Sequence, residues 1–211
     1  MLRLLIIFYK ARPFTWALTM ALLLGTSTAS AQSCNPSPIY AFTQAVYFEQ
    51  YIKAQGLLAR VKKEHSFEMA QFLGQVLNWK QAYDADDSSA QNDAIDQVES
   101  HIKSLTAQLT QRQDIAFMSD AGNIMLHAAR IHLVMGYVLR AAKRAKQGNE
   151  ILLKVVDTEP QYPDAILSLG LYQFYTDVTQ SNFNWVGGLF SFKGNAELGL
   201  EKVRLAIDAS P

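Results

Sequence analysis

The sequence predicts an all-α fold, and three observations support that prediction. From residue 37 onward, apolar residues recur at intervals of three and four, which is the period of an amphipathic helix. No stretch there alternates apolar and polar residues convincingly, and neither Asn-Gly nor Asp-Gly, the common hairpin turns, occurs. The composition, 49% hydrophobic and 18% charged, suits a chain of 211 residues that buries a core. We therefore expect one helical domain, or two small ones.

Residues 1–31 have the three parts of a secretory signal peptide. The only charges are cations near the start, an apolar run follows from Phe14 to Leu24, and Ala29–Ala31 forms a small-residue cleavage site. The run is about half of the ~20 residues that a membrane-spanning helix needs. We expect the segment to be removed and the protein to be exported to the periplasm, with an uncleaved membrane anchor as the alternative. Lipid attachment at Cys34 is not expected, because the apolar run ends ten residues before it.

Residues 32–123 are predicted to form a divergent N-terminal helical region. One helix is expected around Tyr40–Ile52, a second around Phe67–Trp79 and a third around Ala90–Gln111. The acidic stretch 84–89 separates the second from the third. It lacks the turn glycine and the closing glutamate of a calcium loop. Its Asp and Ser residues are therefore expected to cap a helix.

Residues 124–211 are predicted to contain the remaining helices. The fourth is expected from about Ile124 to Lys146, and shorter helices at about 149–158, 162–177 and 195–209. The last turn of the fourth helix gathers Arg140, Lys143, Arg144 and Lys146. The helix dipole favours cations at that end. Because the whole chain has nineteen cations and nineteen anions, we predict no nucleic-acid partner.

Glycines and prolines recur at fixed distances in this second half. Gly136 and Gly170 are 34 residues apart, and a glycine stands twelve residues before each of two prolines. Those pairs are Gly148 with Pro160 and Gly199 with Pro211. The two pairs are 51 residues apart, which equals a period of 34 plus an insertion of 17. A period of 34 residues is typical of a helical repeat.

This spacing resembles the tetratricopeptide repeat, in which helix A packs on helix B through small residues and helix B ends at a proline. The runs Asp164–Tyr175 and Gly194–Leu200 are similar, in particular, to exported bacterial tetratricopeptide proteins with an aromatic insertion in the last repeat. The resemblance implies a right-handed α-solenoid of antiparallel helix pairs. Its first repeat would span 129–162, and its second would begin near Pro163 and carry the insertion at 179–194. Such stacks are usually interaction surfaces.

The resemblance also implies that the first helices of the pairs line a concave groove. The candidate groove residues are Arg130, Leu133, Tyr137, Arg140, Leu167, Leu171, Phe174 and Tyr175. An apolar and aromatic groove would suit an apolar helix or an extended segment of a protein partner. The leucines could equally be core between neighbouring helices, and the sequence leaves both interpretations open.

The insertion forms a second candidate element through its aromatic residues Phe183, Trp185, Phe190 and Phe192. We expect it to fold back over the stack's own apolar surface. Filling the groove and dipping into a membrane interface are the alternatives. Membrane contact is not favoured, because Lys193 is the only cation of the insertion.

No residue pattern predicts catalysis, a metal or a cofactor. His127 and His132 are five residues apart and so lie on different helix faces, whereas ligand pairs share a face at a spacing of three or four. All four histidines are expected at the surface or at the edge of the core. Four acids, Glu68, Asp84, Asp86 and Asp87, would serve a hydrolase only if folding brought two of them together.

The sequence thus predicts a non-catalytic protein–protein interaction scaffold of the bacterial cell envelope. The alternatives are a helical cell-wall hydrolase that uses paired carboxylates and a carrier of a small apolar ligand. We also expect an apolar patch on the last helix pair around Val203 and Ala206. In a repeat protein a following repeat would cover them, so the chain would be a fragment or would complete an interface with another chain.

Overall fold

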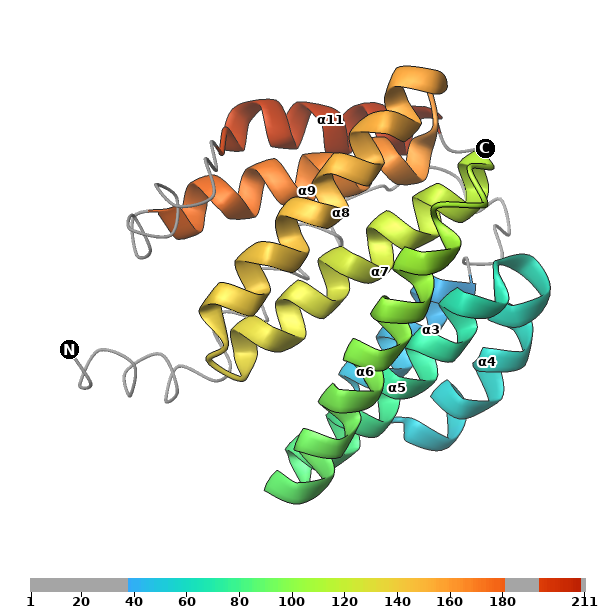
Figure 1. The fold of residues 1–211 in the computed structure, drawn as a ribbon, viewed down its shortest axis with the longest axis vertical. Helices are drawn as coiled ribbons and strands as arrows, with labels where there is room; N and C mark the ends of the chain where they lie inside the picture. The colour runs from blue at the N-terminus through green and yellow to red at the C-terminus, as the bar shows by residue number, and fades with distance from the viewer. Residues whose placement is uncertain (1–37, 181–193, 210–211) are drawn as a thin grey trace, which may run out of the picture. The chain divides into compact units, whose positions relative to one another are not determined.

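The structure, a computed structural model, describes residues 38–180 and 194–209 (Figure 1). These residues form eight α-helices and no strand, which confirms the all-α prediction. The helices are α3 (Pro38–Tyr47), α4 (Tyr51–Glu64), α5 (Phe67–Asp84), α6 (Ser88–Gln108), α7 (Ile115–Val134), α8 (Val138–Thr158), α9 (Pro163–Gln180) and α11 (Ala196–Ala209). The expected signal peptide, Cys34 and the four aromatic residues of the insertion lie outside the described residues. None of the described helices is both long and apolar enough to span a bilayer.

The prediction of one continuous helix over Tyr40–Ile52 is wrong, because a turn between α3 and α4 interrupts it. Glu49 has a φ of 58°, a left-handed conformation that does not continue an α-helix. The backbone N–H of Gln50 donates to the carbonyl of Ala45 at 2.7 Å and closes the end of α3. Apolar residues continue at helical spacing across the break, although Phe48 and Ile52 beside it are exposed, so periodicity alone did not reveal the break.

Side-chain caps start four of the described helices, and at α11 the cap is Asn195, whose Oδ1 accepts from the backbone N–H of Leu198 at 2.9 Å. Ser66, Asp87 and Asp114 each accept a hydrogen bond from the backbone N–H three residues later, at 3.1, 3.0 and 2.9 Å. Such caps satisfy donors that the first turn of a helix leaves without a partner. The cap by Asp87 confirms the prediction that the acidic stretch starts a helix.

The fourth expected helix, Ile124–Lys146, is also wrong, since these residues belong to two helices. The N–H of Tyr137 donates to the carbonyl of His132 at 2.8 Å, and that of Gly136 to Leu133 at 3.0 Å. This is the Schellman pattern of a helix end, and Gly136 holds the left-handed position with a φ of 79°. Gly136 therefore lies in a turn, and its distance of 34 residues from Gly170 does not join equivalent helical positions. The expected repeat at 129–162 likewise begins inside α7.

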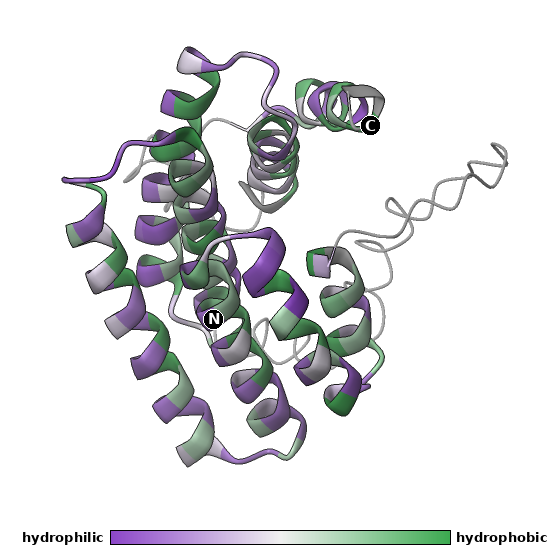
Figure 2. Ribbon diagram, turned by 90° about the vertical axis from the view of Figure 1, so that its right-hand side faces the viewer, coloured by the Kyte–Doolittle hydropathy of each residue, from purple (hydrophilic) through white to green (hydrophobic). Residues whose placement is uncertain are grey.

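The helices pack as successive hairpins, namely α3 with α4, α5 with α6, α7 with α8 and α9 with α11 (Figure 1). Each hairpin also contacts the next, and α7 lies against both α5 and α9. In Figure 2, hydrophobic and hydrophilic stretches alternate along the helices, as expected when one face of each is buried. The expected boundary at residue 123 falls inside α7.

In two of these hairpins, facing glycines let the two helices pack closely against each other. A Cβ atom at Gly148 would lie 2.8 Å from the carbonyl oxygen of Gly122, and one at Gly199 would lie 2.6 Å from that of Gly170. Real Cβ atoms do not approach backbone that closely, so both crossings need glycine. Gly148 and Gly199 are thus equivalent, as the sequence predicts. The partners on the first helices are Gly122 and Gly170.

Two clusters of buried apolar residues form the core. The larger one extends over α3 to α7, with Phe42, Phe72 and Phe117 among its most buried side chains. The smaller one contains Leu152, Val155, Ala165 and Leu169 of α8 and α9. Side chains of α7 contribute to both clusters, so this helix joins them.

Candidate functional site

The candidate groove residues come from more elements than the sequence predicts. Arg130 and Leu133 lie on α7, but Tyr137 is the N-cap residue of α8 and Arg140 belongs to α8 itself. The expected row along one helix is therefore wrong, because the Gly136 turn intervenes. The remaining candidates, Leu167, Leu171, Phe174 and Tyr175, all lie on α9.

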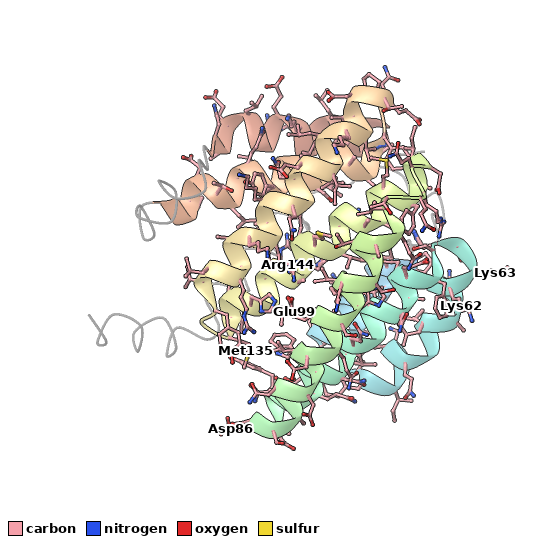
Figure 3. All side chains as sticks on the ribbon, in the orientation of Figure 1. Lys62, Lys63, Asp86, Glu99, Met135 and Arg144 are labelled. Carbon is pink, nitrogen blue, oxygen red and sulfur yellow. The ribbon has the colours of Figure 1, made fainter. Side chains whose placement is uncertain are left out.

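Four exposed apolar residues surround the α7–α8 turn, and we call them the apolar tip. Leu133, Val134, Tyr137 and Leu139 are 40%, 37%, 38% and 55% exposed. Met135, which Figure 3 labels, marks the position of the turn. The four residues lie at the end of the hairpin that the Schellman bonds close, and the Tyr137 ring also lies 6.1 Å from the ring of the buried His132. The guanidinium carbon of Arg140 lies 5.2 Å from the centre of the Tyr137 ring.

The α9 candidates are half-buried and lie in helix contacts. The guanidinium carbon of Arg130 lies 5.4 Å from the centre of the Tyr175 ring and connects α7 with α9. Phe174 faces α11, because its backbone nitrogen would lie 2.7 Å from a Cβ atom at Gly199. Leu167 and Leu171 are also half-buried. The structure thus brings Arg130 to Tyr175 and gathers the apolar tip with Arg140, and the α9 residues act mainly in packing.

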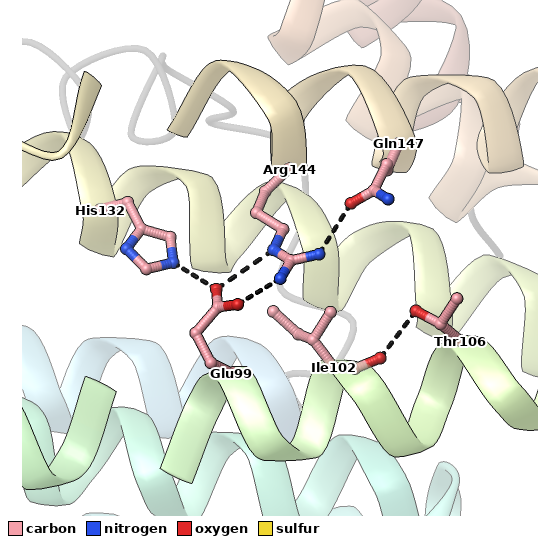
Figure 4. Close-up of polar contacts among 6 residues, drawn as sticks. All are labelled: Glu99, Ile102, Thr106, His132, Arg144 and Gln147. Atoms are coloured by element: carbon pink, nitrogen blue, oxygen red, sulfur yellow. Dashed lines mark hydrogen bonds and ion pairs between the residues drawn. The ribbon is translucent and has the colours of Figure 1, made fainter. Parts of the chain in front are cut away.

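A polar group that the sequence did not reveal joins three helices (Figure 4). The Nε2 atom of His132 on α7 lies 2.6 Å from Oε1 of Glu99 on α6. The Nε atom of Arg144 on α8 donates to the same oxygen at 3.1 Å, and a second guanidinium nitrogen pairs with Oε2. The last guanidinium nitrogen donates to Oε1 of Gln147 at 2.9 Å. Glu99 and Arg144 point toward one another in Figure 3.

The electrostatics of this group follow from its burial. The side chain of His132 is fully buried, and burial lowers the pKa of its imidazole. Burial alone would raise the pKa of Glu99, but hydrogen bonds from Arg144 and His132 keep that pKa below its usual value. The carboxylate is therefore charged and paired at neutral pH. Within the described residues, no three His, Cys, Asp or Glu side chains are placed to hold a metal ion.

The expected place of the histidines at the surface or core edge is only partly correct. His132 and His101 are buried in the core, whereas His65 and His127 are half-buried. The rings of His127 and Phe72 have centroids 6.3 Å apart, while His132 reaches Glu99. The two α7 histidines thus have different neighbours, as their spacing of five predicts.

The basic residues expected at a helix end lie instead in the first half of α8. The dipole explanation is therefore wrong, and three of the four cations have a local contact. Arg144 holds Glu99, Arg140 lies against Tyr137, and Lys146 is 4.0 Å from Glu150.

The structure does not pair the candidate acids Glu68 and Asp84. They stand sixteen positions apart on α5, which is about 24 Å along the axis at ~1.5 Å per residue. Glu68 is 3.4 Å from Arg112, and Asp84 contacts Lys80 and the hydroxyl of Tyr51. Asp86 lies in the turn and Asp87 caps α6. The side chains of Glu68, Asp84 and Asp87 thus have structural partners.

The last described hairpin has an exposed apolar surface on α11, through Leu198, Leu205 and Ile207. Ala206, which was expected to be uncovered, is buried, because it lies on the face of α11 that the hairpin covers. Val203 is half-buried.

Comparison of the chain with protein-family models, with curated proteins and with solved structures gives no match.

Proposed function

We propose that this protein is a non-catalytic protein-binding scaffold and that the apolar tip is one of its contact surfaces. Four large apolar side chains within seven residues, each more than a third exposed, carry this proposal. Exposed apolar residues that gather in one place are typical of interaction sites. The partner is an apolar helix or an extended segment that inserts its own apolar side chains beside Tyr137.

The cations next to the tip define the partner further. Arg140 lies over the Tyr137 ring, and Lys143 and Lys146 are exposed on the following turns of α8. A partner that carries carboxylates beside its apolar residues complements this surface in charge. Complementary charge increases the association rate more than it increases the affinity.

The proposal also includes the arrangement of the helices and the cellular location of the protein. The hairpins stack as a right-handed solenoid of tetratricopeptide type, supported by the contacts of α7 with α5 and α9. Residues 1–31 direct export to the periplasm, supported by their cationic start, apolar run and Ala29–Ala31 site. Mass spectrometry of the protein from its host tests the second point, since cleavage after Ala31 predicts a mature chain that begins at Gln32.

Site-specific photocrosslinking tests the contact surface. A benzoylphenylalanine at position 139 of the full chain, expressed in its host, should yield one discrete adduct, and the same label at the exposed residue Gln111 should not. Leu133→Asp together with Tyr137→Ser should reduce the adduct about tenfold, because central apolar contacts supply most of the binding energy. Equal adducts at 139 and 111, or an adduct that the double variant leaves unchanged, would contradict the proposal.

A further inference from the structure

A cleft of about 340 Å³ lies over α5 between α4 and α6. Its lining residues are Gln55, Leu58, Gln71, Gly74, Gln75, Leu77, Asn78, Gln81 and Gln97. The cleft shares no residue with the apolar tip, so an inference about it does not rest on the function proposed above.

Primary amides dominate the lining of this cleft. Gln71, Gln75, Asn78 and Gln81 follow each other at steps of four, three and three, which places them on one face of α5. The row is about 15 Å long at ~1.5 Å per residue. Gln55 on α4 and Gln97 on α6 add an amide from each side. No residue of the lining is charged, so the cleft has no group to neutralise a charged ligand.

One of these amides has an unused acceptor. The Oε1 atom of Gln75 is buried and has no hydrogen-bond partner among the described residues. A buried acceptor in this state costs free energy, and rotation of the Gln75 amide toward a ligand donor in the cleft would remove that cost. The neighbouring Gly74 keeps the space beside it open, because a Cβ atom there would meet only Leu58 Cδ1, at 3.7 Å.

We propose that this cleft binds an extended, uncharged polypeptide segment through its main-chain amides. A primary amide offers one acceptor and two donors, which match the carbonyl and N–H of a peptide group. Residues three or four apart on a helix are about 5–6 Å apart, close to the ~6.6 Å two-residue repeat of an extended chain. The row accommodates four or five ligand residues, and small apolar side chains of the segment meet Leu58 and Leu77.

The lining favours a peptide over a neutral oligosaccharide. Sugar rings present an apolar face that packs best on an aromatic ring, and no residue of the lining is aromatic. A peptide needs no such platform, because its recognition depends on hydrogen bonds along the backbone.

Side-chain amide spectra provide the test. The probe is an octapeptide of alternating threonine and alanine with acetyl and amide ends, titrated into the full ¹⁵N-labelled chain. Saturable shifts of the NH₂ resonances of Gln71, Gln75 and Asn78 are expected. Gly74→Phe places a ring in the cleft and should weaken binding at least tenfold. Gly74→Ala adds only the Cβ atom and should preserve binding, which makes it the matched control.

Several outcomes would overturn this assignment. These are the absence of saturable shifts, equal affinity of the Gly74→Phe and Gly74→Ala chains, and tighter binding of chitohexaose than of the peptide at the same resonances. If Gly74→Phe does not fold by circular dichroism, Gln71→Leu with Asn78→Leu replaces it, and retained binding there is equally contradictory. Variants of the apolar tip should leave the titration unchanged, so failure here is distinguishable from failure of the proposed function.

Discussion

His132 is the residue whose chemistry depends most on its surroundings. Its Nε2 atom faces Glu99, while its Nδ1 atom is buried without a hydrogen-bond partner among the described residues. A charged imidazole would carry a proton on both nitrogens and leave the Nδ1–H without an acceptor. A neutral ring with its proton on Nε2 leaves only a lone pair unused. The fold therefore favours the neutral form, in agreement with the lowered pKa of His132.

This preference makes stability depend on pH. The pKa of His132 is lower in the fold than the ~6.5 of an unfolded chain, so below pH 6.5 the unfolded state binds more protons. The stabilisation is complete above that value and declines as the pH falls toward the folded pKa. The free energy of unfolding should drop between pH 7.5 and 5, by up to about 1.4 kcal/mol per pH unit below 6.5 for this group. Urea denaturation at both pH values measures the drop.

His132→Gln is the informative variant for this prediction. Glutamine keeps a donor for Glu99 but does not titrate, so the drop between the two pH values should be smaller. It should not vanish, because burial also lowers the pKa of His101 and His127. The lowered pKa of Glu99 affects only more acidic solutions. An undiminished drop in the variant would show that His132 does not contribute.

At the scale of the helices, the facing glycines determine how closely the two helices of a hairpin can approach each other. At the α7–α8 crossing a Cβ atom on Gly148 would meet backbone, which cannot rotate away as a side chain can. Gly122 differs, because a Cβ there would first meet the side chain of Leu152. The close approach therefore depends more on Gly148.

Gly148→Ala should destabilise the protein despite the better helix propensity of alanine. Propensity alone would stabilise the helix by about 1 kcal/mol, whereas overpacking against backbone typically costs about 1–3 kcal/mol. Gly56→Ala on α4 is the matched control, because nothing lies within 4 Å of its new Cβ atom, and it should stabilise by up to about 1 kcal/mol. Thermal unfolding of both variants measures the contrast. A melting temperature that rises equally in both would disprove the close crossing.

Across the whole described unit, the two buried clusters differ in size. The larger one contains residues of five helices, while the smaller one has four buried residues from α8 and α9. Segments with few buried apolar contacts open at lower free energy than the core around them. The α9–α11 hairpin is therefore the part expected to open first.

Native-state hydrogen exchange tests this order. Peptides from α9 and α11 should lose protection at lower denaturant concentration than peptides from α7 and α5. Peptides from α7 should be the last to exchange, because this helix contributes to both clusters. Loss of protection at one common denaturant concentration would indicate a single cooperative unit and contradict the prediction.

The features that were predicted correctly depend on neighbours in the chain. The cap by Asp87 and the starts of α5, α9 and α11 follow from residues within one or two turns. The breaks at Glu49 and Gly136 were missed, because apolar residues continue at helical spacing across each tight turn, whether they are buried or, like Phe48 and Ile52, exposed. Only the Gly-Tyr pair after an apolar run could have signalled the second break.

The features of the candidate site likewise separate into those that local sequence predicts and those that only the packing of helices creates. Composition and local spacing were sufficient for an all-helical chain and for the equivalence of Gly148 and Gly199. Leu133 and Tyr137 became candidate contact residues only through the tetratricopeptide resemblance, and their role in binding stays a prediction. Three features arise only where helices from distant parts of the chain meet. They are the exposure of the apolar tip, the pairing of His132 with Glu99, and the amide-lined cleft. Glu99 is 33 residues from His132 and 45 from Arg144. No local pattern encodes such contacts, because burial and pairing depend on how whole helices pack against one another.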